Sequence, residues 1–222
     1  MTRVAAARHE EYAEERRSLI LNAALQVFAQ LGFGEATMDQ VAKAANMSKA
    51  ALYLYFRSKE ELLERLIQRY ALLPEFPDLV ESIRETPPSE GIPTLTAEVW
   101  RRLRERKELA YVLVREIQSS PKRAKLFYEH AGLRAYHSLA SYLERWMKRG
   151  VLRGQDSFAA AQCLFGMLWS FFLTQELIGG KELHPLSDEK VIKTVAQMFL
   201  SGAANIDRKR LPKTSAGVSQ PL

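Results

Sequence analysis

Residues 37–63 constrain the fold of this chain more than any other stretch, because they contain three helix starts in close succession. Thr37 is followed three positions later by Gln40, which is the pattern of a capping box at a helix N-terminus. Ser48 can cap a second helix, and Ser58 can cap a third. Two short helices joined by a tight turn, with a longer helix behind them, predict a helix-turn-helix.

The second short helix has two distinct faces. Leu52 and Phe56 lie four positions apart, so they share a face and can anchor the helix on a core. Lys49 and Tyr53 are also four apart, on a different face, and are expected to point away from that core. This arrangement suits a helix that enters a DNA groove.

The charge around this helix is locally one-sided. From residue 40 to residue 59 the chain has no carboxylate and four cations, which are Lys43, Lys49, Arg57 and Lys59. Neutralising phosphates requires such a bias. The alternative interpretation is an ordinary helical corner with a solvated basic face.

The chain also resembles a known family here. The stretch from Ser48 to Leu63, SKAALYLYFRSKEELL, is similar to the recognition-helix signature of the TetR family of bacterial transcriptional regulators. Residues 20–42 fit the same pattern, and the resemblance covers about residues 12–72. Leu54 departs from it, since these proteins often carry a polar or aromatic residue at that position. The resemblance implies a homodimer that binds DNA and responds to a ligand held in a C-terminal helical bundle.

The motif positions imply a set of DNA contacts. Lys49 is expected to reach a base edge or an adjacent phosphate, since lysine can donate to guanine acceptors. Ala50 and Ala51 would allow close approach to the groove. The matching positions imply phosphate contacts for Thr37, Ser48, Tyr53 and Lys59. Tyr55 is a further candidate.

Composition supports this interpretation only in part. The chain has 222 residues and a net charge of +6. Residues 1–72 carry ten Lys/Arg and nine Asp/Glu, only +1, so the local cluster is stronger support for DNA binding than the total charge. The single cysteine, Cys163, cannot form an internal disulfide, which fits a reducing cytoplasm. Residues 1–10 lack the apolar core of a signal peptide.

Helical periodicity and the positions of helix-breaking residues divide the chain into four parts. We expect a flexible arm at 1–11, a helix-turn-helix domain at 12–72, a bundle at 73–204 and a disordered tail at 205–222. Prolines and a glycine interrupt regular patterning at the start of the bundle, and from about Thr94 onward the pattern is helical. No stretch shows strand alternation. The predicted fold class is all-α, with an N-terminal three-helix DNA-binding domain and a C-terminal antiparallel helical bundle.

The last two long helices are candidates for a dimer interface. The helix expected over 156–179 is apolar around most of its circumference, although polar residues within it argue against a membrane span. Pairing with the same helices of a second copy would bury this surface in a four-helix interface. The alternative is a purely intrachain core. The expected interface residues are Phe158, Leu164, Leu168, Phe171, Phe172, Val191, Val195 and Phe199.

The bundle also has the composition of a small-molecule pocket. Pockets combine aromatic walls with a few polar groups. The candidate lining residues, each of which could instead be plain core, are Trp100, Tyr111, Glu116, Phe127, His130, His137, Phe165 and Trp169. The expected effector is apolar, and residues 58–93 are expected to transmit its binding to the head.

The sequence shows no motif typical of a metal site or an enzyme active site. His130 and His137 lie seven apart without a third ligand of the usual spacing, so no metal site is expected. We find no phosphate loop or nucleophile elbow, and we expect neither a cofactor nor an enzyme. The sequence predicts a ligand-responsive repressor that binds an inverted-repeat operator as a homodimer. The alternative is a helical ligand-binding or scaffold protein whose DNA-binding head no longer binds.

Overall fold

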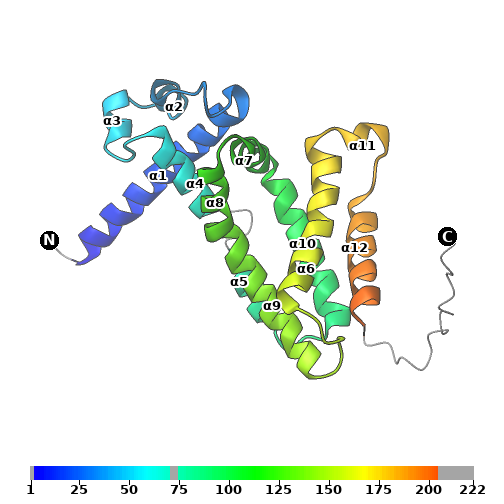
Figure 1. The fold of residues 1–222 in the computed structure, drawn as a ribbon. Helices are drawn as coiled ribbons and strands as arrows, with labels where there is room; N and C mark the ends of the chain where they lie inside the picture. The colour runs from blue at the N-terminus through cyan, green and yellow to red at the C-terminus, as the bar shows by residue number, and fades with distance from the viewer. Residues whose placement is uncertain (1–2, 71–74, 205–222) are drawn as a thin grey trace.

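The computed structural model describes residues 3–70 and 75–204, and these residues form helices joined by turns (Figure 1). Within these ranges there is no strand, only an isolated bridge between Leu152 and Ala204. The all-α prediction is confirmed. The expected tail, 205–222, lies outside the described residues.

An N-terminal head is followed by a larger bundle (Figure 1). The head, residues 3–70, contains α1 (Arg3–Leu31), α2 (Met38–Ala44), α3 (Lys49–Tyr53) and α4 (Lys59–Tyr70). The bundle, residues 75–204, contains α5 (Phe76–Ser82), α6 (Pro88–Glu105), α7 (Lys107–Ser119), α8 (Pro121–Phe127), α9 (Leu133–Lys148), α10 (Ser157–Phe172), α11 (Gly180–Leu183) and α12 (Asp188–Ala203), together with the π-helical segments η1 (Tyr128–Gly132) and η2 (Leu173–Leu177).

The first helix begins earlier than the sequence suggested. Residues 3–11 belong to α1, whereas a loosely ordered arm was expected over 1–11. The stretch contains three consecutive alanines and no proline or glycine, so nothing stops a helix from extending through it.

The caps of the helix-turn-helix form as expected. The Gln40 amide donates to Thr37 Oγ1 at 3.3 Å, and the Thr37 amide donates to Gln40 Oε1 at 2.8 Å. The Ala51 amide donates to Ser48 Oγ at 3.1 Å. Asn46 makes the turn with φ of 52°, in the left-handed region that asparagine tolerates.

The proline-containing start of the bundle is more helical than expected. The structure places α5 and the first turns of α6 within residues 73–93. Pro88 is the first residue of α6, where a missing N–H costs little. Gly91 is required in α6 because a Cβ there would lie 2.3 Å from the Tyr142 hydroxyl oxygen. That hydroxyl donates to the Thr86 carbonyl at 2.9 Å and so fixes the turn before α6.

Residues 121–148 form one continuous helical segment with a wider turn inside it. α8, η1 and α9 follow one another without a break over 121–148, and η1 supplies the π-helical turn. Nothing in the sequence pattern indicated this turn. Turns of this kind are frequent at functional sites.

α7 belongs to both parts of the molecule. It packs against α1, and its Leu109, Val112 and Leu113 are buried in the same apolar cluster as the head residues Ile20, Phe28 and Leu66. The division predicted between 72 and 73 falls in a segment outside the described residues. The two cores nevertheless meet at α7, which therefore connects the head to the bundle.

Candidate nucleic-acid interface and ligand pocket

The outer face of α3 presents the residues expected to contact DNA. Leu52 is 0% exposed and Phe56 is 2% exposed, so they anchor the helix as predicted. Lys49, Ala50 and Tyr53 are exposed on the other side. This short helix thus lies on the head with one face buried and one face free.

The remaining candidates divide between the surface and the core of the head. Thr37 and Ser48 are exposed at the starts of α2 and α3. Ala51 is half-buried, and Tyr55 packs against the head's apolar cluster. Leu54, which the sequence marked as a departure from the family pattern, is 84% exposed beside Tyr53. An exposed apolar side chain at this place could contact a thymine methyl group.

Lys59 has a different role from the expected phosphate contact. Its ammonium donates to the carbonyls of Phe33, Gly34 and Ala36 at 2.8, 2.7 and 3.1 Å. It also lies 4.9 Å from the centre of the Phe33 ring. Because an ammonium has three donors, all of them are used inside the protein. Lys59 holds the turn between α1 and α2 in place and is not available to a phosphate.

Lys49 is paired within the head. Its Nζ lies 2.7 Å from Asp39 Oδ1, across the gap between α3 and α2. The hydrogen bond to Asp39 raises the pKa of Lys49, so the ammonium stays charged. Sequence reasoning missed this pair, although opposite charges at the starts of neighbouring helices are a usable signal.

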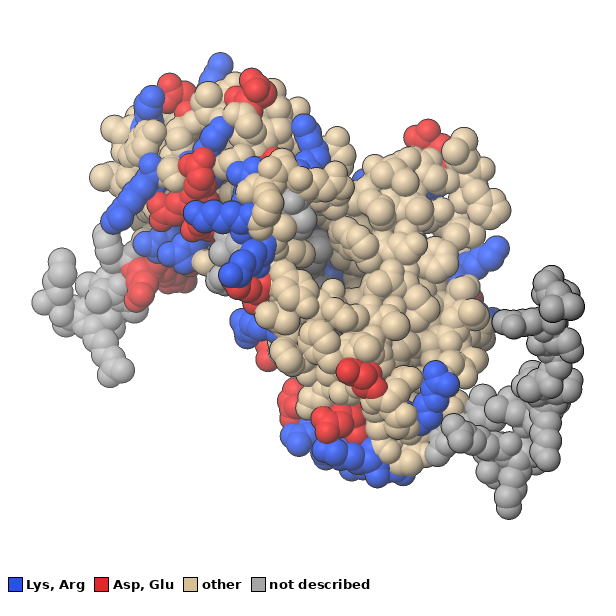
Figure 2. Space-filling model, in the orientation of Figure 1, with Lys and Arg blue, Asp and Glu red and all other residues tan. Residues whose placement is uncertain are grey.

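Charged side chains gather over the head, whereas much of the bundle surface seen in Figure 2 is uncharged. With Lys59 directed inward and Lys49 paired, Lys43 and Arg57 remain exposed cations close to α3.

The bundle contains a cavity of about 590 Å³ between α6, α7, α8, α9 and α10. Its walls are mainly aliphatic and aromatic, and no lining residue is charged. Polar atoms come from Gln118, Gln162, Tyr128 and Tyr136. Burial raises the pKa of the Tyr136 hydroxyl, so it remains a neutral hydrogen-bonding group. Such a cavity suits a neutral, largely apolar molecule with few polar groups.

The structure brings three of the eight expected lining residues together at this cavity, namely Phe127, Phe165 and Trp169. Trp100 is 2% exposed in the core behind it. Glu116 is buried and pairs with Arg123 at 3.0 Å.

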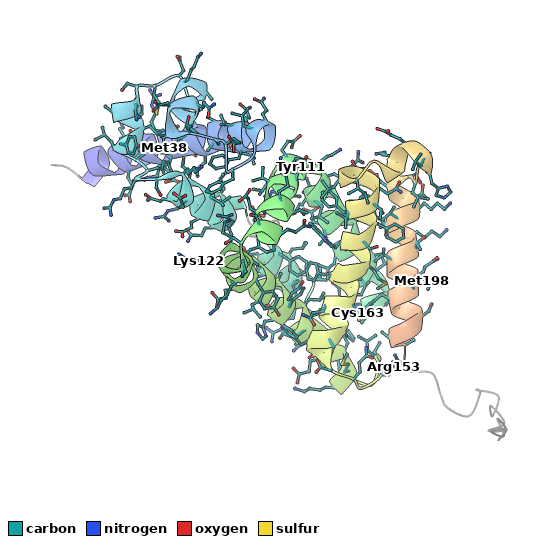
Figure 3. All side chains as sticks on the ribbon, turned by 45° about the horizontal axis from the view of Figure 1, so that its top comes forward. Met38, Tyr111, Lys122, Arg153, Cys163 and Met198 are labelled. Carbon is teal, nitrogen blue, oxygen red and sulfur yellow. The ribbon has the colours of Figure 1, made fainter. Side chains whose placement is uncertain are left out.

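The other candidates are elsewhere. Tyr111 lines a separate cleft of about 530 Å³ that also includes α1 and η2 residues, under the Arg115 guanidinium (Figure 3). His137 lies in a surface hollow between α5 and α9, with its ring 5.0 Å from that of Phe158. The side chain of His130 lies outside the described residues. Aromatic spacing alone could not show which face of each helix met the cavity.

Two side chains connect the cavity to the head. Leu113 lines the cavity and is buried in the head's apolar cluster, and Phe127 lines the cavity and packs against that cluster. Nearby, the Arg123 guanidinium carbon lies 5.0 Å from the centre of the Phe33 ring. α7 and α8 therefore contact both the cavity and the turn that precedes Thr37.

The exposed residues of α10 are uncharged, whereas α12 also exposes charged side chains, among them Lys190 and Lys193; neither surface is formed mainly by the residues that were expected to provide the interface. The exposed residues of α10 include Cys163, Ser170 and Gly166, of which Gly166 also lines the cavity, and α12 exposes Met198 to 66%. Figure 3 shows Cys163 and Met198 on these two helices. The positions of Cβ atoms on Gly166 and on Gly202 would be in open space. Small residues of this kind permit another helix to approach closely.

Most of the expected interface residues lie inside the single chain. Exposed fractions of 6% or less place six of them in the bundle core, which are Leu164, Leu168, Phe172, Val191, Val195 and Phe199. Phe158 and Phe171 are half-buried. A helix that is apolar on all sides gives no periodic signal for which side faces its own chain, so the bulky residues were assigned to the wrong face.

The same helix is the part of the described chain that is long and apolar enough to cross a membrane. The segment Ser157–Leu177 has a mean hydropathy of 1.4, and 28% of it is buried. In the structure it packs against α9, α6 and α12. Core helices of soluble proteins pass the same criterion, so this is weak support for a membrane span. Within the described ranges, no three His, Cys, Asp or Glu side chains are grouped so as to hold a metal ion.

Two family models match the chain. One, for bacterial regulatory proteins of the tetR family, matches residues 20–66, and the other, for the C-terminal domain of AefR-like transcriptional repressors, matches residues 104–202. The chain belongs to the TetR family. It is a helix-turn-helix transcriptional regulator, and regulators of this family bind DNA and small-molecule ligands and act as dimers.

Curated relatives match about a quarter of this TetR-family protein. The uncharacterized regulator YhgD of Bacillus subtilis is 46% identical over 52 residues, which are 23% of this chain and 27% of YhgD. The regulator SrpR of Pseudomonas putida is 42% identical over 55 residues, 25% of this chain and 26% of SrpR. The matches thus span about a quarter of the length of these relatives.

Solved structures match over most of the chain. The fatty acid degradation regulator FadR from Bacillus halodurans is 25% identical with a TM-score of 0.71, over 84% of this chain and 95% of that one. FadR from Bacillus subtilis, in complex with stearoyl-CoA, is 23% identical with a TM-score of 0.70, over 83% of this chain and 98% of that one. The second likeness concerns the fold alone.

Proposed function

We propose that this TetR-family protein is a cytoplasmic homodimeric repressor that binds an inverted-repeat operator and releases it when an apolar effector fills the cavity between α6 and α10. The observation that carries the proposal is α3, whose buried side is anchored by Leu52 and Phe56 while Lys49, Ala50 and Tyr53 are exposed. Lys49 contacts a base edge or adjacent phosphate, Tyr53 contacts a phosphate, and the caps at Thr37 and Ser48 direct helix N-termini toward the backbone.

The dimer forms through the outer faces of α10 and α12. The exposed residues of α10 are small or uncharged, Met198 is exposed on α12, and monomeric proteins seldom expose large apolar areas. A two-fold axis between the paired helices places two α3 helices in successive major grooves, roughly 34–36 Å apart on one face of the duplex. The operator is therefore an inverted repeat.

The effector is a molecule whose buried part is uncharged. The cavity of about 590 Å³ has no charged lining residue, and an unpaired carboxylate buried there would be costly. The related FadR from Bacillus subtilis was crystallised with stearoyl-CoA, which combines a long apolar chain with a charged group at one end. A long-chain acyl thioester is the first candidate class.

The signal passes through α7 and α8. Leu113 and Phe127 contact both the cavity and the head's apolar cluster, so an effector that displaces them also moves the head. A difference of about 1–3 kcal/mol between the two states would change operator affinity about 5–150-fold. The segment 58–93, expected from the sequence to act as the hinge, includes residues 71–74 that lie outside the described part of the chain.

Selection of bound fragments from a random DNA pool by the purified protein tests the DNA-binding part of the proposal. An enriched inverted repeat is expected from the wild-type dimer. A folded dimer that enriches no sequence would contradict the proposal and would favour a ligand-binding protein without operator recognition.

The enriched repeat then tests the effector class. Stearoyl-CoA is expected to weaken operator binding, because its acyl chain can fill the cavity while its charged end stays outside. Equal operator affinity with and without a panel of acyl thioesters and neutral apolar compounds would reject the proposed release.

A further inference from the structure

The ion pair between Asp39 and Lys49 lies on the exposed side of the head that is proposed to face DNA. Asp39 is in the first turn of α2 and Lys49 is the first residue of α3. Their charged atoms are 2.7 Å apart, and the side chains are 64% and 59% exposed. Exposed ion pairs of this kind contribute little to stability. The pair also borders an open hollow of about 490 Å³ between α2 and α3, next to Ser48.

The pair offers a donor beside an acceptor, and a G·C base pair offers the complementary groups. In the major groove, guanine presents O6 and N7 as acceptors, and cytosine presents its N4 amino group as a donor. Lysine commonly donates to the guanine atoms, and a carboxylate accepts from cytosine N4. Guanine O6 and cytosine N4 are themselves hydrogen-bonded, at roughly the 2.9 Å usual for such bonds. This spacing resembles the 2.7 Å between Lys49 Nζ and Asp39 Oδ1.

We propose that Asp39 and Lys49 together read one G·C base pair in each half of the operator. Lys49 donates to guanine O6 and N7 while Asp39 accepts from the N4 amino group of cytosine. The inference rests on the proposed DNA binding and adds a specificity-determining residue, Asp39, that is not among the expected contacts.

The Asp39 carboxylate makes the pair selective for G·C over the other base pairs. Beside Lys49 its charge is compensated, so the pair can approach DNA without a net negative charge. With a reversed C·G pair, Asp39 would face guanine acceptors, which repel it. With an A·T pair, Lys49 would meet adenine N7 beside a donor amino group, and Asp39 would face the thymine O4 acceptor. With a T·A pair, Lys49 would meet a single acceptor, thymine O4, next to the thymine methyl group. One correctly read base pair is worth roughly 5–150-fold in affinity over the alternatives.

Selection from a random DNA pool by wild type, Asp39→Asn, Lys49→Ala and Lys49→Arg tests the proposal. Wild type is expected to enrich a repeat with one fixed G·C position per half. Asp39→Asn and Lys49→Ala should lose preference at that position alone, and Asp39→Asn should admit T·A there, because asparagine at position 39 would then face adenine, with which it pairs. Lys49→Arg should keep the preference, since arginine donates to the same guanine atoms.

Glu64→Gln is the matched control, because it removes one negative charge at an exposed position of α4. It should raise affinity for all DNA by the same factor and leave the enriched sequence unchanged. An Asp39→Asn motif identical to that of wild type would overturn the inference while leaving the proposed function intact. Failure of the folded wild-type dimer to enrich any repeat would overturn both.

Discussion

At the scale of single residues, Lys49 and Lys59 show how structure separates two lysines that look alike in the sequence. Both lie in the cationic stretch around α3, and both match motif positions expected to contact DNA. Lys49 is exposed and paired with Asp39, so its contact can be exchanged for DNA. Lys59 donates three hydrogen bonds to carbonyls of the turn before α2 and thereby stabilises the position of Thr37.

Replacing Lys59 with alanine should therefore destabilise the fold. Hydrogen bonds to a charged group contribute about 1.5–3 kcal/mol, so we expect Lys59→Ala to lower the free energy of unfolding by about 2 kcal/mol. Urea unfolding followed by circular dichroism measures the change, with the exposed Lys43→Ala as control. Equal stability of the two variants would show that Lys59 is not structural.

Glu98 should contribute a pH-dependent part of the stability. Hydrogen bonds from Arg101, and then from Arg102, lower its pKa from 4.5 to about 2. A lowered pKa in the folded state stabilises the protein above pH 4.5, and this contribution is lost as the pH falls toward 2. Glu98→Gln should thus be less stable than wild type at pH 7, with a difference that shrinks toward pH 2. Urea unfolding across this range measures it, and a difference independent of pH would contradict the account.

At the scale of elements, α7 and α8 form the contact between cavity and head. Glu116 on α7 is buried and pairs with Arg123 on α8, whose guanidinium covers the Phe33 ring of the head. A shift of α8 would therefore disturb both the ion pair and the turn before α2. This contact joins a helix that lines the cavity to the turn that precedes Thr37.

Replacing one partner of this ion pair should lower the free energy of unfolding more than replacing both partners. Arg123→Met leaves the Glu116 carboxylate buried without its partner, and we expect a loss of about 3 kcal/mol in the free energy of unfolding. The double variant Glu116→Leu Arg123→Met should recover part of it, because no buried charge remains. If the double variant were no more stable than the single one, the buried carboxylate would not be the cause.

Sequence patterns predicted where the helices lie in the chain better than they predicted which face of each helix is buried. The caps at Thr37 and Ser48 are local, so the residues that define them lie next to each other in the chain. The outer face of α10 depends on which neighbours pack against it, and an evenly apolar helix carries no such information. Contacts between segments also determine the Asp39–Lys49 pair and the hydrogen bonds of Lys59 to the turn before α2. Periodicity does not encode such contacts.

At the scale of the whole molecule, the proposed inverted-repeat operator requires two heads in a fixed relation, which the proposed pairing of α10 and α12 with a second copy would provide. In the proposed dimer each protomer supplies the same face, and the small exposed residue Gly202 lets the helices approach. The cavity lies behind the same α10 helix, which contributes Phe165 and Trp169 to it.

A charge placed on this face should separate the protomers. Met198→Glu puts a carboxylate on the outer side of α12, where its mate in the second copy would be close, and should shift the protein to monomers in sedimentation equilibrium. Operator affinity should fall with it, since one head alone has half the contacts. Ser141→Glu, on the exposed side of α9, is the control and should stay dimeric. A dimeric Met198→Glu protein would place the interface elsewhere.

The central claim is that the exposed face of α3 reads DNA, and operator affinity of the double variant Lys49→Ala Tyr53→Phe tests it most directly. Both side chains are exposed, so the variant should fold and dimerise as wild type does. Fluorescence anisotropy with the enriched repeat should show affinity reduced by at least about tenfold, the scale of one lost base contact together with a phosphate contact. Unchanged affinity in a folded dimer would contradict the claim and place DNA recognition outside α3.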